Sequence, residues 1–126
     1  MQPRLLPIDR LPRRLRLGLY AAAVAMLIYI CLAPHQDLPP GADLVWDKAE
    51  HASAWTVLTA LGLILSTRRR WAIGIFALLF GVVIEIAQAT MGWGRNGDWR
   101  DLIADLVGIA VAYLIWAAAR WVMGRR

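Results

Sequence analysis

The sequence is poor in the residues that stabilise small proteins by cross-links or metal clusters. Among its 126 residues there is one cysteine, Cys31, so neither an intramolecular disulfide nor a cysteine-based zinc site can form. It has no serine- or glycine-rich linker and no internal repeat, which favours a single domain. No recognised catalytic motif is present, and the residues alone therefore name no reaction.

Apolar residues, in contrast, make up 60% of the chain. A soluble domain of this length would need a very large core to bury them, whereas a lipid bilayer accommodates them directly. The formal net charge is +5, but the basic residues flank apolar runs, which indicates membrane topology and not nucleic-acid binding. We therefore expect an integral membrane protein that contacts membrane lipids, with no nucleic-acid partner and no cofactor.

Four apolar runs predict four helices. The first, from Leu17 to Ala33, covers roughly 25 Å and is not followed by a small-residue cleavage site, so we interpret it as an uncleaved span. The second follows Asp43 or Asp47 as a helix N-cap. The sequence thus predicts an all-α integral membrane bundle with a basic leader, residues 1–16, a four-span domain, residues 17–119, and a basic tail, residues 120–126; the later spans cover about residues 49–65, 71–90 and 100–119.

The charge distribution predicts the orientation of these spans. Eleven of the fourteen basic residues lie in the leader, in the turn at residues 68–70 and in the tail, whereas eight of the nine acidic residues lie toward the opposite side. By the positive-inside rule, both termini are expected in the cytoplasm. Two interfacial tryptophan belts fit this plan, one of Trp46, Trp93 and Trp99 and the other of Trp71, Trp116 and Trp121.

Polar residues open the second span. In a helix, Asp47, His51 and Trp55 lie on one face, and Lys48 flanks His51. Lys48 and Glu50 could simply be solvated in the headgroup region. His51 is a turn deeper, where it serves either as a proton carrier or ligand, or as a packed histidine.

The third span carries a polar pair near its outer end. Glu85 and Gln88 are three residues apart on this helix. A carboxylate at that depth must find a partner or become protonated, because charge is costly there. Either a functional site or a structural hydrogen bond to a neighbouring helix satisfies that requirement.

The fourth span begins with acidic residues. Asp101 and Asp105 are one turn apart and repel each other unless a cation, a proton or an arginine lies between them. Arg95 can neutralise one, and His51 or a metal ion the other. Gly108 and Ala112 continue the same face with small side chains, which predicts a helix-packing surface.

In this order, Asp47-Lys48-x-x-His51, Glu85-x-x-Gln88, Arg95, Asp101 and Gly108 resemble the VanZ-like family of small bacterial membrane proteins over residues 46–119. The resemblance implies a four-span plan in the bacterial cytoplasmic membrane. It also implies a link, in the family's named members, to low-level teicoplanin resistance without a known reaction. Asp105 departs from the asparagine usual in the family, and a carboxylate adds charge where an amide is neutral.

Three hypotheses for function follow. In the first, an outward polar cup binds a cell-wall precursor, lipid headgroup or glycopeptide. Arg95, Arg100 and Lys48 would hold an anionic phosphate of this ligand. The cup comprises Asp47, Lys48, His51, Glu85, Gln88, Arg95, Asp101 and Asp105.

The alternative is an intramembrane hydrolase or transferase acting on a lipid-linked substrate, for which the catalytic candidates are His51, Glu85 and Asp101. His51 or Glu85 would be the general base, and a divalent cation could bind His51, Glu85, Asp101 and Asp105. Ser53, a potential nucleophile, is on another face of the helix from His51. A proton-coupled transporter ranks last, because so short a chain would transport only as a homo-oligomer.

Overall fold

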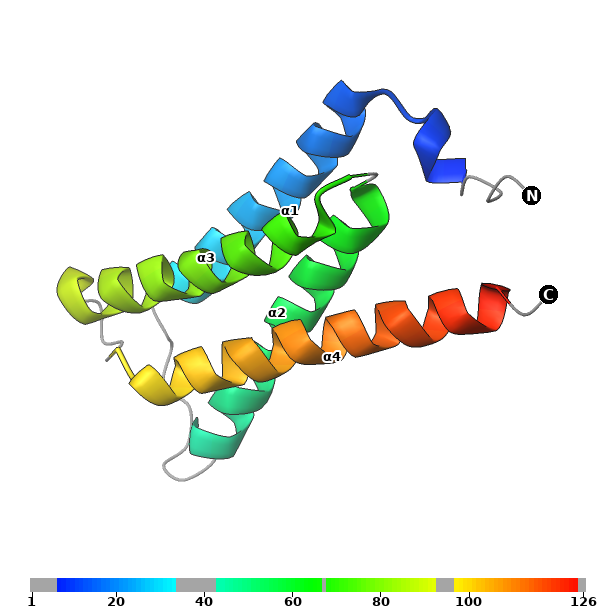
Figure 1. The fold of residues 1–126 in the computed structure, drawn as a ribbon. Coiled ribbons are helices and arrows are strands. Elements are labelled where there is room, and N and C mark those ends of the chain that lie inside the picture. Colours follow the sequence, from blue (N-terminus) through cyan, green and yellow to red (C-terminus); the bar gives the residue numbers. More distant parts are fainter. Residues whose placement is uncertain (1–6, 34–42, 67, 93–96, 125–126) are drawn as a thin grey trace.

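The computed structural model describes residues 7–33, 43–66, 68–92 and 97–124. Within these residues the chain is all-α, as predicted, and it contains one short 3-10 helix and four long helices (Figure 1). The elements are η1 (Pro7–Arg10), α1 (Arg13–Leu32), α2 (Asp43–Leu65), α3 (Arg70–Met91) and α4 (Trp99–Gly124).

Three helix boundaries differ from the sequence expectation. Helix α1 begins at Arg13, directly after Pro12, so the last arginines of the expected leader are helical. Helix α2 begins at Asp43, which places Asp47 inside the helix and makes its expected N-cap role wrong. Helix α4 continues to Gly124, so the first residues of the expected tail, Arg120 included, are helical.

Helices α1, α3 and α4 are long and apolar enough to cross a membrane. They direct large apolar side chains outward, such as Met26 at 63%, Leu79 at 59% and Leu114 at 69% exposure. Such a surface requires lipid rather than water around it. The chain is therefore a multi-pass membrane protein.

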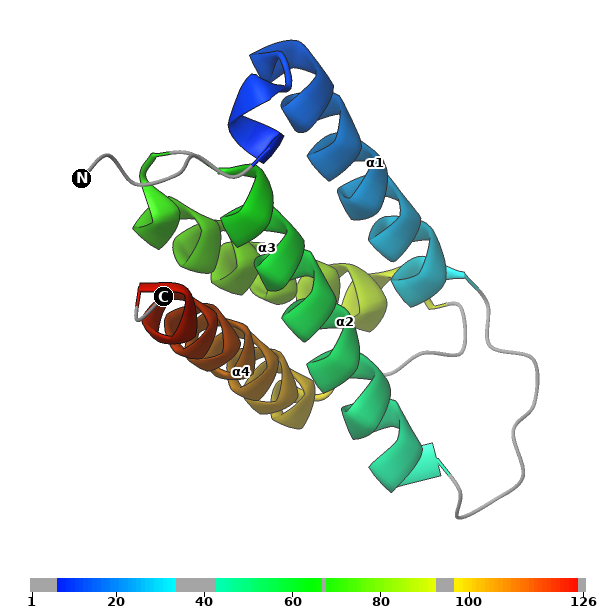
Figure 2. The ribbon, with the colours of Figure 1, turned by 90° about the vertical axis from the view of Figure 1, so that its right-hand side faces the viewer.

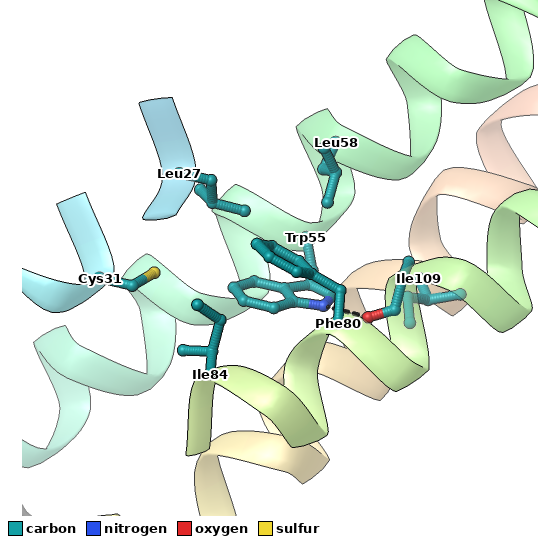
Figure 3. Packing of buried hydrophobic residues seen from close by; sticks show 8 residues of the cluster. Leu27, Cys31, Trp55, Leu58, Phe80, Ile84 and Ile109 are labelled. Carbon is teal, nitrogen blue, oxygen red and sulfur yellow. Dashed lines mark hydrogen bonds between the residues drawn. The ribbon is translucent and has the colours of Figure 1, made fainter. Parts of the chain in front are cut away.

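Helix α2, the long helix that is not among these three, packs against all of them. Figures 1 and 2 show it crossing between α1 on one side and α4 on the other. Its central residue, Trp55, is fully buried, and its ring stacks between His51 and Phe80 at 5.6 Å from each. The indole Nε1 donates a hydrogen bond to the Ala77 carbonyl oxygen over 2.8 Å, which ties α2 to α3 (Figure 3).

Helices α2 and α4 make the closest crossing. A Cβ atom on Gly108 would lie 2.3 Å from the Ala52 carbonyl oxygen, so only glycine permits this backbone approach. The Thr56 hydroxyl lies 2.7 Å from that oxygen and 3.1 Å from the Gly108 carbonyl oxygen. Ala112 is also buried, at 1% exposure, which confirms the predicted packing surface of small residues.

Candidate functional site at the start of α2 and α4

The starts of α2 and α4 and the last turns of α3 lie at the same end of the bundle (Figure 1). Because adjacent helices alternate in direction, polar residues far apart in the sequence meet there. We call this group the polar cluster; it consists of Asp47, Lys48, His51, Glu85, Asp98, Asp101 and Asp105. It contains six of the eight residues expected in the cup.

Lys48 is the cationic centre of the polar cluster. Its Nζ atom lies 3.0 Å from Asp98 Oδ2 and 3.6 Å from Asp47 Oδ2. It also donates a hydrogen bond to Asp101 Oδ1. The Asp101 side chain is only 4% exposed, so the ammonium group takes the place of water as its hydrogen-bond donor. Three carboxylates from two helices and a loop therefore converge on one amine.

His51 forms a second, deeper pair with Asp105. Its Nδ1 atom lies 2.9 Å from Asp105 Oδ1, and both side chains are buried, at 5% and 0% exposure. An ionised carboxylate only accepts hydrogen bonds, so the Nδ1–H group donates to it. This leaves Nε2 on the other side of the ring, 3.8 Å from Asp101 Oδ2. The imidazole thus links the two aspartates of α4.

Asp98 belongs to the cluster although the sequence analysis did not place it in the cup. Its Oδ1 atom accepts a hydrogen bond from the backbone N–H of Arg100 over 2.9 Å, as expected of the N-cap residue of α4. That hydrogen bond lowers the pKa of Asp98, and the hydrogen bond from Lys48 lowers it further. The spacing Asp98-x-x-Asp101 before an apolar run is a capping signal that could have identified it.

Glu85 closes the cluster from α3. Its Oε2 atom accepts the backbone N–H of Asp98 over 2.8 Å, while its Oε1 atom is buried without a hydrogen-bond partner among the described residues. Asp105 Oδ2 is in the same situation, and a Cβ atom on Gly81 would lie 2.7 Å from it. Gly81 therefore makes the room on α3 that a carboxylate of α4 occupies.

Of the other two expected cup residues, the structure describes only Gln88, which makes a different contact. Gln88 is buried, and its side chain donates to the Cys31 carbonyl oxygen over 2.9 Å, which joins α3 to α1. Arg95 lies outside the described residues, as do Trp93 and the side chain of Trp46. Arg100 is exposed, with its guanidinium carbon 5.9 Å from the Trp99 ring centroid.

One group of side chains in the cluster has the composition of a metal site. One ligand atom from each of Asp47, His51 and Asp101 lies within 4.8 Å of the others. The expected cation site combined His51 and Asp101 with Glu85 and Asp105. In the structure Asp47 joins His51 and Asp101 instead, and Asp105 contacts His51 through Nδ1. A carboxylate in that position orients a metal-binding histidine. The Lys48 ammonium supplies positive charge to the same carboxylates.

Comparisons with known proteins agree with the resemblance. No curated protein and no solved structure significantly matches the chain. The sequence profile of the VanZ/LLP1 family matches residues 48–120, which include α3, most of α2 and α4, and every member of the polar cluster except Asp47. Because this match covers more than half of the sequence, the chain belongs to the VanZ/LLP1 family.

Proposed function

We propose that the protein has four spans in the bacterial cytoplasmic membrane, with both termini in the cytoplasm. Helix α2 is then a span in addition to α1, α3 and α4, because its polar residues face neighbouring helices or the end of the bundle, whereas Val57 and Ile64 are exposed along its length. The arginines of the leader, of the turn at residues 68–70 and of the last helical turns support this orientation. The polar cluster then faces outward.

The proposed function is ligand binding without catalysis. The ligand is a lipid headgroup, a cell-wall precursor or a glycopeptide, recognised at the polar cluster through an ammonium group. The observation that supports this is the convergence of the Asp47, Asp98 and Asp101 carboxylates on the Lys48 amine. A site that already coordinates one alkylammonium group has the geometry and charge to accept another.

The charge balance also favours a cationic ligand group over the anionic phosphate of the sequence hypothesis. Among the described residues, the cluster contains five carboxyl groups and two bases, Lys48 and His51. Lys48 is engaged by those carboxylates. A phosphate would therefore meet net negative charge. A ligand amine would instead compete with Lys48 for Asp47 and Asp98, whose side chains are 34% and 31% exposed.

Native mass spectrometry of the purified protein with added lipids tests this proposal. Phosphatidylethanolamine and phosphatidylcholine share a phosphate, but only the former has ammonium N–H donors. Retention of phosphatidylethanolamine at about tenfold higher occupancy, close to the value of one charged hydrogen bond, is expected. Equal retention of the two lipids would contradict recognition through the ammonium N–H donors.

Variants locate the binding. Asp47→Asn should lower the occupancy, whereas Glu50→Gln, which removes an exposed carboxylate outside the cluster, should leave it unchanged. Lys48→Met should raise it, because the carboxylates lose their internal amine. The phosphate hypothesis predicts the reverse for Lys48, so weaker binding by that variant would overturn the ammonium proposal.

The link to antibiotic resistance is tested in cells. A sensitive host that accumulates the protein should be protected against teicoplanin more than against vancomycin. His51→Ala, Glu85→Gln and Asp101→Asn should each abolish the protection at equal membrane abundance, because each changes a buried or hydrogen-bonded member of the cluster. Protection that persists in all three would place the activity elsewhere in the molecule.

The buried His51–Asp105 pair favours a second candidate, an intramembrane enzyme acting on a lipid-linked substrate. Asp105 fixes the tautomer of His51, and Nε2 is then the basic nitrogen. In this mechanism Nε2 would accept a proton from an attacking hydroxyl group or water of the bound lipid-linked substrate. Release of headgroup from a labelled lipid, lost in His51→Gln, would support it. Lipid that stays intact while it binds would exclude it.

A further inference from the structure

A cavity of about 730 Å³ lies at the opposite end of the bundle, where α1 and α3 begin and α2 ends. Four arginines line it: Arg13 and Arg16 from α1, and Arg68 and Arg69 from the turn before α3. None of its described lining residues is acidic. Guanidinium groups brought together in this way repel one another unless an anion lies between them.

Two neighbouring features also suit an anion. Helix α3 begins at the cavity, and its N-cap residue, Arg69, makes no side-chain capping hydrogen bond, so the positive end of the helix dipole adds to the arginine charge. Tyr20 lines the same cavity, and its hydroxyl group is buried without a hydrogen-bond partner among the described residues. A ligand oxygen would satisfy that hydroxyl group.

The apolar part of the lining distinguishes a lipid from a free ion. Leu17, Leu65 and Ile73 lie beside the arginines. Leu17 lines the cavity and is 55% exposed, so the cavity reaches the surface of the bundle beside this apolar side chain. Basic pockets between membrane helices are typical sites for anionic headgroups. An acyl chain could leave the cavity along Leu17 while the phosphate stays with the arginines.

We propose that this cavity, the basic pocket, binds the phosphate headgroup of an anionic glycerophospholipid. Arg13, Arg68 and Arg69 contact the phosphate oxygens, and the Tyr20 hydroxyl group donates to a phosphate or ester oxygen. Arg16 also positions the site, because its Nη1 atom donates to the Leu65 carbonyl oxygen over 2.9 Å and holds α1 against the end of α2. The proposal is independent of ligand binding at the polar cluster.

Native mass spectrometry of the full chain with phosphatidylglycerol, phosphatidylcholine or inorganic phosphate tests it. Phosphatidylglycerol is expected to bind at least about tenfold more tightly than phosphatidylcholine, since only the former carries net charge. Inorganic phosphate should not displace it at millimolar concentration. Displacement by inorganic phosphate would identify a free-ion site and overturn the lipid assignment.

A pair of adjacent arginines separates the pocket from general surface charge. Arg13 lines the pocket, whereas its exposed neighbour Arg14 does not. Arg13→Gln should weaken phosphatidylglycerol binding about tenfold, the value of one charge-assisted hydrogen bond, while Arg14→Gln should change it less than about threefold. Equal losses in the two variants would show that only the charge of the region matters, and would contradict the pocket.

Tyr20→Phe gives a second measurement that does not remove charge. It keeps the ring, whose centroid lies 5.8 Å from that of Phe76, and deletes only the hydroxyl group. Weaker binding of phosphatidylglycerol by about threefold to fivefold, with unchanged thermal stability of the lipid-free protein, is expected from one neutral hydrogen bond. Unchanged binding would remove Tyr20 from the site, and unchanged binding in Arg13→Gln as well would overturn the proposal.

Discussion

At the end of the bundle where α2 and α4 begin, acidic and basic side chains contact one another, whereas at the end where α1 and α3 begin four arginines line one cavity. In the polar cluster, Lys48 and His51 are within 4 Å of carboxylates from α4 or its N-cap. In the basic pocket, arginines surround a cavity whose described lining residues include no acidic side chain. The described residues therefore place acidic and basic side chains in contact at one end and line a cavity with basic side chains at the other.

This difference separates what each end contributes to folding and to binding. Removing one partner of a buried ion pair leaves the other charge buried without compensation. Substitutions in the polar cluster are therefore expected to lower the free energy of unfolding. Exposed arginines remain hydrated in the folded protein, so replacing one should change the free energy of unfolding little. Substitutions in the basic pocket are therefore expected to lower anion binding more than stability. Substitutions at the two ends should therefore give opposite patterns in unfolding and lipid-binding measurements.

The largest expected effect is that of His51→Ala. It leaves the fully buried Asp105 carboxylate without its hydrogen-bond donor, and breaking a buried pair in this way costs about 3–5 kcal/mol. The free energy of unfolding in mixed detergent micelles measures the change. Ser53→Ala, at an exposed position of the same helix, should stay within about 0.5 kcal/mol.

A second substitution tests whether the stranded charge causes that loss. Asp105→Asn retains an oxygen that can accept from His51 and removes the charge. Combined with His51→Ala, it should recover part of the lost stability, so the two changes should be less than additive. Full additivity would mean that His51 stabilises the bundle by packing on Trp55 and not by pairing with Asp105.

A smaller loss is expected at the crossing of α2 and α4. Gly108→Ala places a Cβ atom against the Ala52 carbonyl oxygen, and this overpacking should cost about 1–3 kcal/mol of unfolding free energy. Gly18→Ala is the matched control, because no atom lies within 4 Å of its Cβ position, and alanine is the better helix former. The control should be neutral or stabilising.

The same pair of variants distinguishes the two ends by binding. Helices α2 and α4 both contribute to the polar cluster, but no residue of α4 lines the basic pocket. Displacement of α4 in Gly108→Ala should therefore weaken binding of phosphatidylethanolamine and spare binding of phosphatidylglycerol. Equal loss of both lipids would show that the bundle responds as one unit and would remove the distinction between its ends.

Relations within one helix could be predicted from the sequence. The i, i+4, i+8 spacing of Asp47, His51 and Trp55 was enough to place them on one face, and His51 and Trp55 are stacked. The small-residue face of Gly108 and Ala112 was likewise predictable, because close helix contact in a bilayer requires such residues. Both arguments use helical periodicity alone.

Relations between helices could not be predicted in this way. The pairing of Lys48 with Asp98 and Asp101 depends on how α2 crosses α4, and the contact of Gln88 with the Cys31 carbonyl depends on where α1 ends. The arginines at the other end were interpreted only as topology signals. Their cavity arises because three helix ends converge, which no single segment of sequence encodes.

Acid should affect the polar cluster and leave the basic pocket charged. The folded-state pKa of Asp98 is lowered by the Arg100 N–H group and Lys48, so its contribution to stability is present above the ordinary aspartate pKa of about 3.9. That contribution is lost as the pH falls through the lower folded-state pKa. Arginines do not titrate in this range.

Unfolding measured between pH 7 and pH 2.5 should therefore show less acid destabilisation in Asp98→Asn than in the wild type. Arg13→Gln, at the other end, should leave the pH profile unchanged. The effect is expected to be smaller than that of His51→Ala, because Asp98 is partly exposed and water screens its charge. If unfolding depends on pH in Asp98→Asn as it does in the wild type, the acid response belongs to other carboxylates of the cluster.

The smallest expected effect compares two tyrosines near the end where α3 begins. The Tyr113 hydroxyl group donates to the Arg70 carbonyl oxygen over 2.6 Å and accepts the Gly74 N–H group over 3.0 Å, so Tyr113→Phe should cost about 1–2 kcal/mol. Tyr20→Phe removes a buried hydroxyl group without a described partner and should be neutral or slightly stabilising in lipid-free protein.

Anionic lipid should change this ranking, and that change sharpens the comparison between the two ends. If the Tyr20 hydroxyl group bonds to a headgroup, added phosphatidylglycerol should stabilise the wild type more than Tyr20→Phe and should stabilise Tyr113→Phe as much as the wild type. Thermal unfolding with and without the lipid measures these shifts. Equal shifts in all three proteins would mean that Tyr20 carries its unsatisfied hydroxyl group even with lipid bound, and that the arginines alone balance the anion.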